Sequence, residues 1–416
     1  MKDILIINQY GSTPNTGFGG RTFYMAKSLA RYSNLTVVYG SYHHQLRSAD
    51  HQKPHVNHDY DNPFSICVLK LFKYSSSRSI FRIINWFIFS IKLCFLSKET
   101  IGFRPSCIVY SSPALPGYLG AYILARRLSC PLFLEVRDIW PLSIIDLGRF
   151  SSRNWLVMLL AQIEKFAYKT ADGVVSNLYD LPRHISKTVG KPIRFHFSPN
   201  GVDSNNSQIE ESDKTSKALD KMLHKVNSWR DAGKSVVGYV GGLAQANSMD
   251  LLIDTASLAR EDSELVFIIV GDGPEKERLE VKCLELGLTN IYFYSGVPKC
   301  HVHLALNAMD ILFLANHFKE IYSYGVSPMK LPEYLESTKP IIHVTNARSL
   351  LDDVGCWEVV REHEPEAVLR SLYKIKKLPA GEKLRAGMQA KNYTKSNLNY
   401  DTVGDSLIAF LDDLGL

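Results

Sequence analysis

The feature that most constrains the fold is a regular alternation of short apolar runs with longer amphipathic stretches, which continues through most of the 416 residues. This alternation is typical of parallel β-sheets that are covered by helices on both faces. It predicts an α/β chain, with strands at residues 3–8, 35–40, 65–70, 107–112, 131–137, 173–177 and 193–198 in the first half and at 236–240, 265–270, 291–294, 311–315 and 340–344 in the second.

The length of the chain predicts two domains, because a single hydrophobic core rarely grows to this size. A polar stretch at 204–216 follows the sequence Ser-Pro-Asn-Gly-Val-Asp at 198–203 and lacks the apolar residues to join either core. We therefore expect domains at 1–203 and 204–398. The last segment, 399–416, has apolar residues at helical spacing and predicts an amphipathic helix that must cover a surface.

Composition narrows the class of protein. Hydrophobic residues make up 45% and charged residues 22%, which disfavours both a disordered chain and an integral membrane protein. The seven cysteines are scattered and never form a C-x-x-C pair, so a reducing cytoplasm fits better than a disulfide framework. The N-terminus reads as a core strand rather than a signal peptide. The formal charge of +6 favours anionic partners such as nucleotide diphosphates or acidic lipids, and charge alone also permits nucleic acid.

The segment 80–96 is unusually aromatic and is flanked by basic residues. It is too short to span a bilayer and is interrupted by Lys92. It could lie in a membrane interface, with aromatic side chains at headgroup depth and cations near anionic lipid. The alternative is a core helix whose cations reach solvent. The cations in question are Lys70, Lys73, Arg78, Arg82, Lys92 and Lys98.

A glycine-rich loop follows the first predicted strand and opens a helix, with Gly19, Gly20 and Arg21 at its end. Such a loop lets a ligand approach the backbone and the positive end of a helix. It lacks the spacing of the dinucleotide fingerprint, and the second strand is not followed by an acid for a ribose, so a nicotinamide enzyme is disfavoured. A tight turn that serves only packing is the alternative.

A second group of polar residues follows the strand at 131–137. Glu135, Arg137, Asp138 and Trp140 should lie near the ligand crevice, because ligands bind beyond the carboxyl ends of strands in open α/β sheets. The alternative is an ion pair of Arg137 with Glu135 or Asp138 that only holds the loop.

Glycines also end the strands of the second half, at Gly241 and Gly242, at Gly271 before Asp272, and at Gly296 before Val297. Backbone amides at the first of these strand ends, Gly241 and Gly242, could receive a phosphate. The stretch 324–342, Tyr-Gly-Val-Ser-Pro-Met-Lys-Leu-Pro-Glu-Tyr-Leu-Glu-Ser-Thr-Lys-Pro-Ile-Ile, adds a glycine loop, a lysine and a glutamate at a predicted helix start. Together these residues predict an anion site in the second domain.

Taken together, Glu-Val-Arg-Asp-Ile-Trp-Pro at 135–141, the segment 198–203 and the stretch 324–342 resemble bacterial glycosyltransferase family 4, in particular its O-antigen and capsule branch. The resemblance implies a GT-B fold, in which two Rossmann-like domains face each other across a cleft and the C-terminal helix crosses back to the first domain. It also implies a cytoplasmic enzyme, peripheral at the inner membrane, that retains the anomeric configuration.

The resemblance assigns donor contacts to the second domain. Gly325, Val326, Ser327 and Lys330 would hold the diphosphate of a UDP- or GDP-linked sugar, Glu333 would bind the ribose, and the base would lie near Gly296 and Val297. No metal or other cofactor is then expected. Two features depart from the family pattern: Gly325 stands where a first glutamate is usual, with Glu320 nearby but out of register, and 242–247 contains no cation.

The implied reaction moves the sugar to a lipid-linked glycan, with membrane contact through 80–96. Lys330 would stabilise the leaving diphosphate, while Asp138 and Arg137 would position the acceptor, near Gly19, Gly20, Arg21, Glu135 and Trp140. Two other functions stay open, a sugar-nucleotide epimerase of the same architecture and a non-catalytic partner that binds a sugar nucleotide or glycan. Nucleic acid is disfavoured because no known reader motif is present. Five histidines in one loop, His43, His44, His51, His55 and His58, lack the helical spacing of a metal site and could contact the acceptor.

Overall fold

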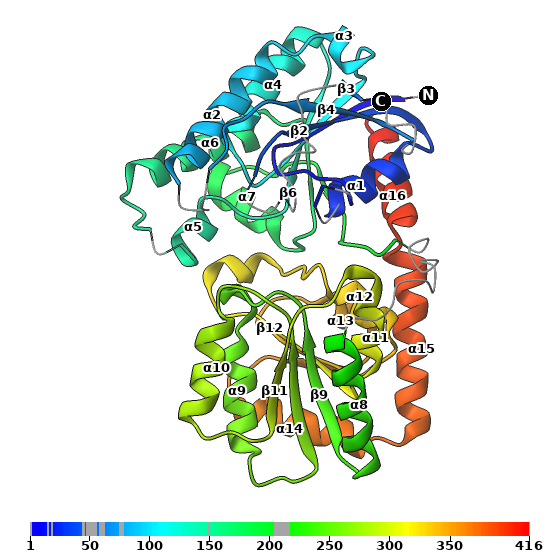
Figure 1. Cartoon of the computed structure of the whole chain (residues 1–416). Coiled ribbons are helices and arrows are strands. Elements are labelled where there is room, and N and C mark those ends of the chain that lie inside the picture. The colour runs from blue at the N-terminus through cyan, green and yellow to red at the C-terminus, as the bar shows by residue number, and fades with distance from the viewer. Residues whose placement is uncertain are drawn as a thin grey trace. The chain divides into compact units, whose positions relative to one another are not determined.

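The chain forms two compact units in the computed structural model (Figure 1). The first unit comprises Met1–Asn200 and Tyr400–Leu416, and the second unit comprises Gly201–Asn399. The structure describes residues 2–14, 16, 17, 20–43, 46, 56, 57, 63–74, 79–148, 150–203 and 217–415. Gly19, Arg78, the polar stretch 204–216 and the histidines at 44, 51, 55 and 58 lie outside the described residues.

The first unit is built on one mainly parallel sheet with the strand order β3-β4-β2-β1-β5-β6-β7-β8 among its described residues. Among the strands that the described ranges contain, β3 alone runs antiparallel to its neighbour. The central strands are almost completely buried and read as continuous apolar runs, as expected for a sheet covered on both faces. The strands are β1 Lys2–Asn8, β2 Ser33–Gly40, β3 Val56–Asn57, β4 Ser65–Leu69, β5 Cys107–Ser111, β6 Leu132–Val136, β7 Gly173–Ser176 and β8 Phe195–Phe197.

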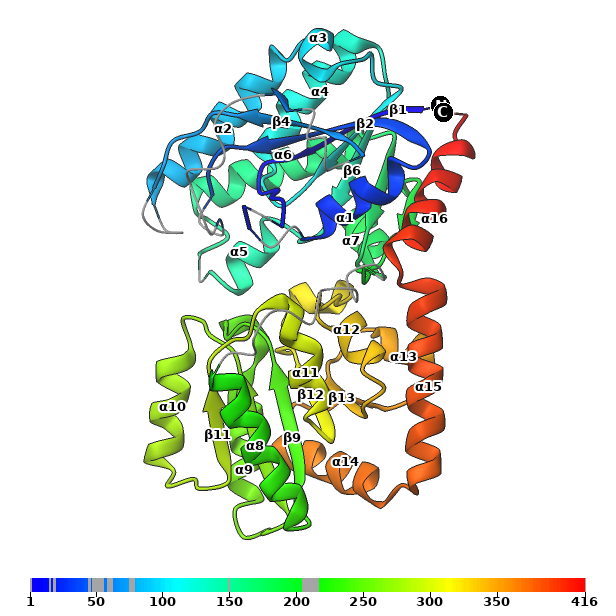
Figure 2. The ribbon, with the colours of Figure 1, turned by 45° about the vertical axis from the view of Figure 1, so that its right-hand side comes forward.

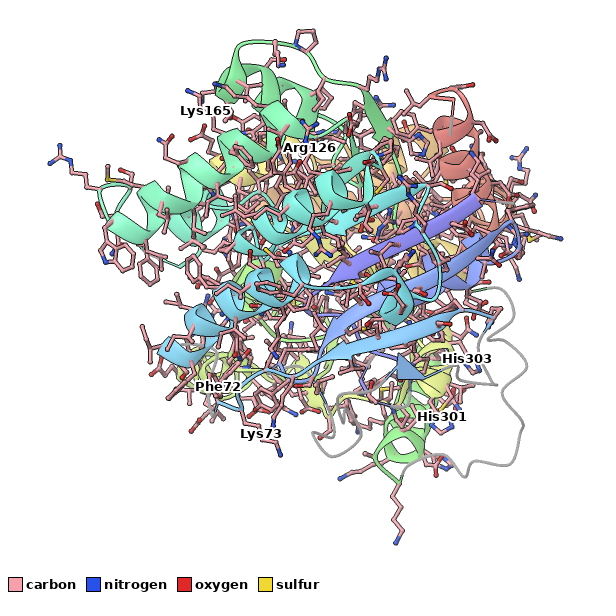
Figure 3. The ribbon with its side chains drawn as sticks, turned by 90° about the horizontal axis from the view of Figure 1, so that it is seen from above. Phe72, Lys73, Arg126, Lys165, His301 and His303 are labelled. Atoms are coloured by element: carbon pink, nitrogen blue, oxygen red, sulfur yellow. The ribbon has the colours of Figure 1, made fainter. Side chains whose placement is uncertain are left out.

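Helices of the first unit cover this sheet. Figure 3 shows α2, α4 and α6 side by side. The backbones of α2 and α4 touch at Gly120, where an added Cβ would lie 2.0 Å from the carbonyl oxygen of Ser90, so only glycine fits. The helices are α1 Gly20–Leu29, α2 Ile80–Cys94, α3 Lys98–Ile101, α4 Pro116–Leu128, α5 Leu142–Asp146, α6 Trp155–Thr170, α7 Leu181–Val189 and α16 Tyr400–Asp412.

The last helix, α16, belongs to the first unit although it ends the chain. Its apolar face, with Val403, Leu407 and Leu411, joins the core cluster that α1 and strands β1 and β2 build. An added Cβ at Gly404 would lie 2.2 Å from Oγ of Ser28 on α1, so the two helices are in close contact. The amphipathic C-terminal segment therefore covers a surface of the first unit.

The second unit is built on a parallel sheet with the strand order β11-β10-β9-β12-β13-β14 among its described residues. All of its strand pairings are parallel. The central strand β10 is buried at every position, with the sequence Leu-Val-Phe-Ile-Ile-Val. The strands are β9 Ser235–Val240, β10 Leu265–Val270, β11 Ile291–Tyr294, β12 Ile311–Ala315, β13 Ile341–Val344 and β14 Glu358–Val360.

Helices surround the second sheet, and α15 runs beside α12 and α13 (Figure 2). The helices are α8 Lys217–Asp231, α9 Met249–Leu258, α10 Lys276–Glu285, α11 Val302–Asn307, α12 Leu331–Glu336, α13 Leu350–Val354, α14 Pro365–Lys377 and α15 Ala380–Asn397. Short 3-10 turns are η2 Gln245–Asn247, η3 Lys299–His301 and η4 Glu320–Tyr324. The carboxyl ends of β9, β10, β11 and β12 therefore lead into the segments in which the sequence predicts an anion site.

The predicted α/β class is confirmed, and each predicted strand coincides with an observed one. The prediction missed β3 and β14. Both are very short, with two and three residues, and both lie at sheet edges. Such segments carry too few residues to show a strand pattern.

Candidate functional site

Lys330 is the polar centre of the segments that follow the strands of the second unit. Its ammonium donates to Oη of Tyr239 at 2.9 Å and to Oδ1 of Asn247 at 3.0 Å. The ammonium also lies 4.9 Å from the centroid of the Tyr239 ring, within the range of a cation–π contact. Tyr239 comes from β9, Asn247 from the turn after it, and Lys330 from the residue just before α12. Three segments therefore converge on one cation.

The charge of Lys330 is sensitive to its surroundings. Burial lowers the pKa of its ammonium to about 8, because low-dielectric surroundings disfavour the charged form. Burial raises the pKa of the Tyr239 phenol, so this hydroxyl keeps its proton and offers only a neutral oxygen. Both hydrogen bonds of the ammonium thus go to neutral acceptors. A cation held in this way can still bind an anion, because its charge is not neutralised by a carboxylate in these contacts.

The glycines at the strand ends allow close approach of backbone and side chains. An added Cβ at Gly241 would lie 2.6 Å from Cε of Lys330, and one at Gly271 would lie 1.9 Å from the carbonyl oxygen of Gly241. Any other residue at these positions would displace Lys330 or the neighbouring strand end. The predicted glycine positions are thus structural requirements of the Lys330 site.

Three of the predicted glycines use their amides inside the unit. The N–H of Gly241 donates to Val270, that of Gly271 to Tyr294, and that of Gly296 to the carboxylate of Asp272. The Gly241 amide therefore completes the sheet, while the predicted base contacts near Gly296 stay a prediction. Asp272 also pairs with Lys276 at 2.8 Å. Among the other predicted positions, Gly242 is exposed and Val297 is half-buried.

The loop before α12 is also partly closed. Gly325 and Val326 are buried, and the N–H of Gly325 donates to the carbonyl of Tyr322. Gly325 has φ 110°, which favours glycine. Ser327 and Lys330 are half-buried and keep access to solvent. The N–H of Gly325 is therefore used inside the loop, while the predicted diphosphate contacts of Val326, Ser327 and Lys330 stay a prediction.

Glu333, the predicted ribose ligand, forms an ion pair with Lys299. Lys299 belongs to η3, which follows β11 and the predicted base position at Gly296. The pair places a carboxylate and an ammonium together at the first turn of α12. Sequence reasoning missed Lys299, because nothing in the local pattern around it indicates a partner 34 residues away.

In the first unit, Arg21 and Glu135 form a buried ion pair of 2.7 Å. The same guanidinium donates to Oγ of Ser198 at 2.6 Å and to the carbonyl of Pro199, and Glu135 accepts from Ser111 at 2.5 Å. The side chain of Arg21 is fully buried. This is a correction: the sequence predicted acceptor contact for both residues, but their charged groups are engaged with each other and hold the segment at which the first unit ends.

Arg137 and Asp138 are half-buried and follow β6, as the sequence predicted. Asp138 accepts hydrogen bonds from Nε1 of Trp140 at 3.1 Å and from Oγ of Ser143 at 3.0 Å. Burial raises the pKa of the Asp138 carboxyl, and these two hydrogen bonds partly oppose that shift. The close ion pair of Glu135 is with Arg21, but the charge of Arg137 interacts with both Glu135 and Asp138, as the alternative reading of the sequence expected.

An arginine and three aromatic rings gather beside Asp138. The guanidinium of Arg82 on α2 lies 5.7 Å to 5.9 Å from the ring centroids of Tyr10, Trp86 and Trp140. Nε of Arg82 donates to Oη of Tyr10 at 3.3 Å, and this oxygen also accepts from Nε1 of Trp86 at 2.6 Å. Arg82 was expected to face lipid, but it faces this aromatic cluster. The sequence shows that Arg82 is a cation but does not show which way its side chain points.

The remaining first-unit predictions concern its first loop. Gly20 begins α1 with φ 67°, and His43 is buried with Nε2 3.2 Å from the carbonyl oxygen of Gly11. His43 is therefore turned into the unit and does not offer its ring to an acceptor. Across the described part of the chain, no three His, Cys, Asp or Glu side chains gather in a way that could hold a metal ion.

Comparisons with known proteins agree with this arrangement. Residues 221–395, all within the second unit, match the family model described as Glycosyl transferases group 1. The chain is 23% identical over 174 residues to 2-deoxystreptamine glucosyltransferase of Streptomyces kanamyceticus, an alignment that covers 41% of this chain and 43% of that protein. It is 21% identical over 307 residues to the probable glycosyltransferase WbjE of Pseudomonas aeruginosa, which covers 72% of each chain.

Solved structures match over the whole length. The Anabaena HepE protein in complex with UDP and glucose has a TM-score of 0.69 at 14% identity, with 99% of this chain and 100% of that chain covered. Sucrose-phosphate synthase of Thermosynechococcus elongatus has a TM-score of 0.71 at 13% identity, with 100% and 99% covered. At these identities the likeness establishes the fold, which is that of GT-B glycosyltransferases. The second unit carries a domain that matches Glycosyl transferases group 1, and both of these curated relatives are named as glycosyltransferases.

Proposed function

We propose that the chain transfers a sugar from a UDP- or GDP-linked donor to a lipid-linked glycan, with retention of the anomeric configuration, as a family 4 enzyme of bacterial O-antigen or capsule synthesis. The observation that carries the proposal is the ammonium of Lys330, held by the neutral oxygens of Tyr239 and Asn247 at the strand ends of the second unit. The likeness to WbjE supports a role in polysaccharide synthesis.

In this proposal the second unit binds the donor. Lys330 and Ser327 contact the diphosphate, and Glu333 accepts hydrogen bonds from the ribose hydroxyls. Lys299 forms an ion pair with the Glu333 carboxylate and holds it at the first turn of α12. The HepE protein of similar fold was solved in complex with UDP and glucose, which is consistent with a uridine nucleotide as donor. No divalent metal is needed in this scheme, because Lys330 supplies positive charge to the phosphates.

The reaction breaks the bond between the anomeric carbon and the phosphate oxygen and forms a bond from that carbon to an acceptor hydroxyl oxygen. Negative charge grows on the leaving diphosphate while the sugar becomes oxocarbenium-like. A pre-placed cation stabilises this charge more in the transition state than in the ground state. The departing phosphate oxygen takes the proton of the acceptor hydroxyl. In the first unit, Asp138 and Arg137 bind and orient the acceptor.

Replacement of Lys330 tests the proposal. We expect Lys330→Ala to lower turnover about 100-fold or more, because one electrostatic contact to developing charge is worth that factor in comparable sites. The matched control is Lys374→Ala, which removes an exposed cation of the same unit that pairs with Glu358. UDP and GDP, with their sugars, are screened by thermal shift, since a ligand that binds the folded state raises its melting temperature. Unchanged turnover of purified Lys330→Ala would refute the role of this residue.

The second part of the proposal is membrane contact through α2. The helix begins at Ile80, and the side chain of the preceding residue, Ser79, accepts a hydrogen bond from the N–H of Phe81. One face, with Trp86, Phe89 and Leu93, is buried in the first unit. The other face exposes large apolar side chains that recur along the helix: Ile80, Phe81, Ile84, Ile91 and Phe95. α2 is therefore a core helix on one side and presents an apolar surface on the other, and this surface supports the proposed membrane contact.

Neighbouring side chains extend this apolar surface. Phe72 is 54% exposed and lies beside Lys73, as Figure 3 shows, with its ring 6.2 Å from that of Phe81. Lys92 is exposed within the apolar face. Aromatic and aliphatic groups with interspersed cations fit the interface of a bilayer that contains anionic lipid. No helix in the described ranges is long and apolar enough to cross a membrane, so the proposal is a surface contact.

Liposome flotation tests the membrane contact. The wild-type chain should float with vesicles that contain anionic lipid, and it should float less when salt is raised. The double substitution Ile91→Ser and Phe95→Ser should abolish flotation, because it removes two exposed apolar groups. The control is Leu284→Ser, a residue of the second unit that is 80% exposed. Equal flotation of wild type and double variant would rule out α2 as the contact.

A further inference from the structure

Two histidines and a serine form a continuous hydrogen-bond chain beside the Lys330 site. Oγ of Ser248 lies 2.8 Å from Nε2 of His363 and 3.3 Å from Nδ1 of His317. Nε2 of His317 lies 2.8 Å from the carbonyl oxygen of Gln245. The three side chains follow different strands: Ser248 comes after β9, His317 after β12 and His363 after β14. The chain therefore ties together three loops at the carboxyl end of the second sheet.

The direction of each hydrogen bond follows from the chemistry of the groups. The Gln245 carbonyl only accepts, so Nε2 of His317 carries a proton. In the tautomer with its proton on Nε2, Nδ1 of His317 accepts from the Ser248 hydroxyl, and the oxygen of that hydroxyl accepts from Nε2–H of His363. Burial lowers the pKa of His363, and the neighbouring His317 lowers it further. In this tautomer all three hydrogen bonds are made at once.

The network contacts the turn on both sides of Asn247, at Gln245 two residues before it and at Ser248 directly after it. Gln245 and Ser248 bracket that residue in the turn after β9, and Ser248 has left-handed backbone angles of φ 49° and ψ 43°. A residue other than glycine adopts this conformation only where surrounding contacts hold it. Nδ2 of Asn247 donates to the Gly242 carbonyl, and its Oδ1 accepts from Lys330. A shift of this turn would thus move an oxygen that stabilises the Lys330 charge.

We propose that His317, Ser248 and His363 are positioning residues that fix Asn247 and thereby set the charge of Lys330 for diphosphate binding. The role in diphosphate binding rests on the proposed donor site. The effect of the network on Asn247 and Lys330 does not depend on any ligand. The two imidazole rings are stacked, with centroids 5.8 Å apart, and Phe318 packs edge-on against His363 at 5.3 Å. The network is therefore packed as well as hydrogen-bonded.

The test measures the titration of Lys330 in the full chain without ligand. Lysines are labelled by reductive ¹³C-methylation, and the Lys330 signal is assigned from its absence in Lys330→Arg. In the wild type we expect a pKa of about 8. His363→Leu removes the donor to Ser248, so Asn247 should loosen and the pKa of Lys330 should fall. His363→Gln keeps an N–H donor at the same end of the side chain and should restore the wild-type titration.

Two further variants distinguish a role in positioning Asn247 from a role in the stability of the fold alone. Ser248→Gly relieves the left-handed backbone but removes the hydroxyl, so it should shift the Lys330 titration as His363→Leu does. His303→Leu replaces an exposed histidine of the same unit, labelled in Figure 3, and should leave the titration unchanged. A Lys330 titration that is the same in wild type, Ser248→Gly and folded His363→Leu would overturn the inference.

A second readout connects the network to the donor. Affinity for UDP, measured by calorimetry at pH 7, should fall about tenfold in His363→Leu and recover in His363→Gln, since a hydrogen bond to a charged group is worth at least that factor. If the Lys330 titration shifts while no uridine or guanosine nucleotide binds the wild type, the network is upheld and the proposed donor is wrong. If UDP binds the wild type and the titration does not move, the donor site stands and the positioning role fails.

Discussion

The buried pair of Arg21 and Glu135 gives the sharpest stability prediction. Glu135→Gln keeps the size and most hydrogen-bonding capacity of the side chain but removes its negative charge. The Arg21 guanidinium would then stay fully buried, with its donors still directed at Ser198 and Pro199, but without a counter-ion. Because an uncompensated charge in the interior cannot be solvated, the folded state of the first unit is destabilised.

The magnitude follows from burial. Removal of one partner from a buried ion pair costs about 3–5 kcal/mol, and the Arg21 side chain has no exposed surface through which water could reduce this cost. In a unit of about 200 residues, each kcal/mol lowers the melting temperature by about 2–4 °C, so we expect a fall of about 10 °C. The double variant Arg21→Met with Glu135→Gln removes the stranded charge and should be more stable than Glu135→Gln alone.

The pH dependence provides an internal check. Burial alone would raise the pKa of the Glu135 carboxyl, but Arg21, Arg137 and the hydrogen bond from Ser111 outweigh it and hold that pKa below its usual value. A carboxyl whose pKa is lowered by folding contributes stability above its unfolded pKa of about 4.3, and this contribution is lost as the pH falls through the folded value. The difference between wild type and Glu135→Gln should therefore persist from pH 8 to 5 and shrink in stronger acid.

Thermal unfolding at pH 7, with hydrogen exchange of peptides from α1 and β6, measures the effect. The exchange data assign the loss to the first unit, since these two elements carry Arg21 and Glu135. The reasoning is refuted if Glu135→Gln melts with the wild type. It is also refuted if the double variant is destabilised by the sum of the two single substitutions, because the charges would then not interact.

Three further outcomes are expected. Gly271→Ala should destabilise the second unit by about 1–3 kcal/mol in urea unfolding, because the new Cβ would lie 1.9 Å from the Gly241 carbonyl oxygen. The control Gly242→Ala, whose new Cβ would lie 3.9 Å from the nearest atom, should be as stable as the wild type. UDP affinity should fall about tenfold from pH 7 to 9 as Lys330 loses its proton near pH 8, and calorimetry of Lys330→Arg, which stays charged, should show no such fall. Leu411→Ala should cost about 3 kcal/mol in thermal unfolding, since this side chain is completely buried in the first core.

Local patterns made most of the fold predictable. Buried parallel strands appear in the sequence as continuous apolar runs, and β10 is an example with every position buried. For the helix α2, the apolar pattern did not show which residues are buried. Its apolar residues lie on both faces, so the sequence could not separate those that pack against the first unit, such as Phe89, from exposed ones such as Phe95. Only the direction in which each side chain points decides between these roles.

The candidate site was predictable where its residues follow one another in the chain, and not where they meet through space. Lys330 and Glu333 lie in one short stretch, so their types and spacing were visible. Lys299 and Asn247 reach them from 34 and 83 residues away. Arg21 and Glu135 are separated by 114 residues. Their ion pair could not be predicted, because a charged residue at the end of a strand can contact either a ligand or another residue of the protein.

Arg21 and Lys330 show how a protein can assign opposite roles to two cations that the sequence presents alike. The guanidinium of Arg21 is met by a carboxylate, a hydroxyl and a carbonyl, which satisfies its charge and fixes the segment it touches. The ammonium of Lys330 is met by a phenol and an amide oxygen, which satisfy its N–H groups but leave its charge in place. An incoming diphosphate would have no carboxylate to displace from these contacts of Lys330. The identity of the acceptors, and not burial alone, is therefore what supports Lys330 rather than Arg21 as the cation of the proposed donor site.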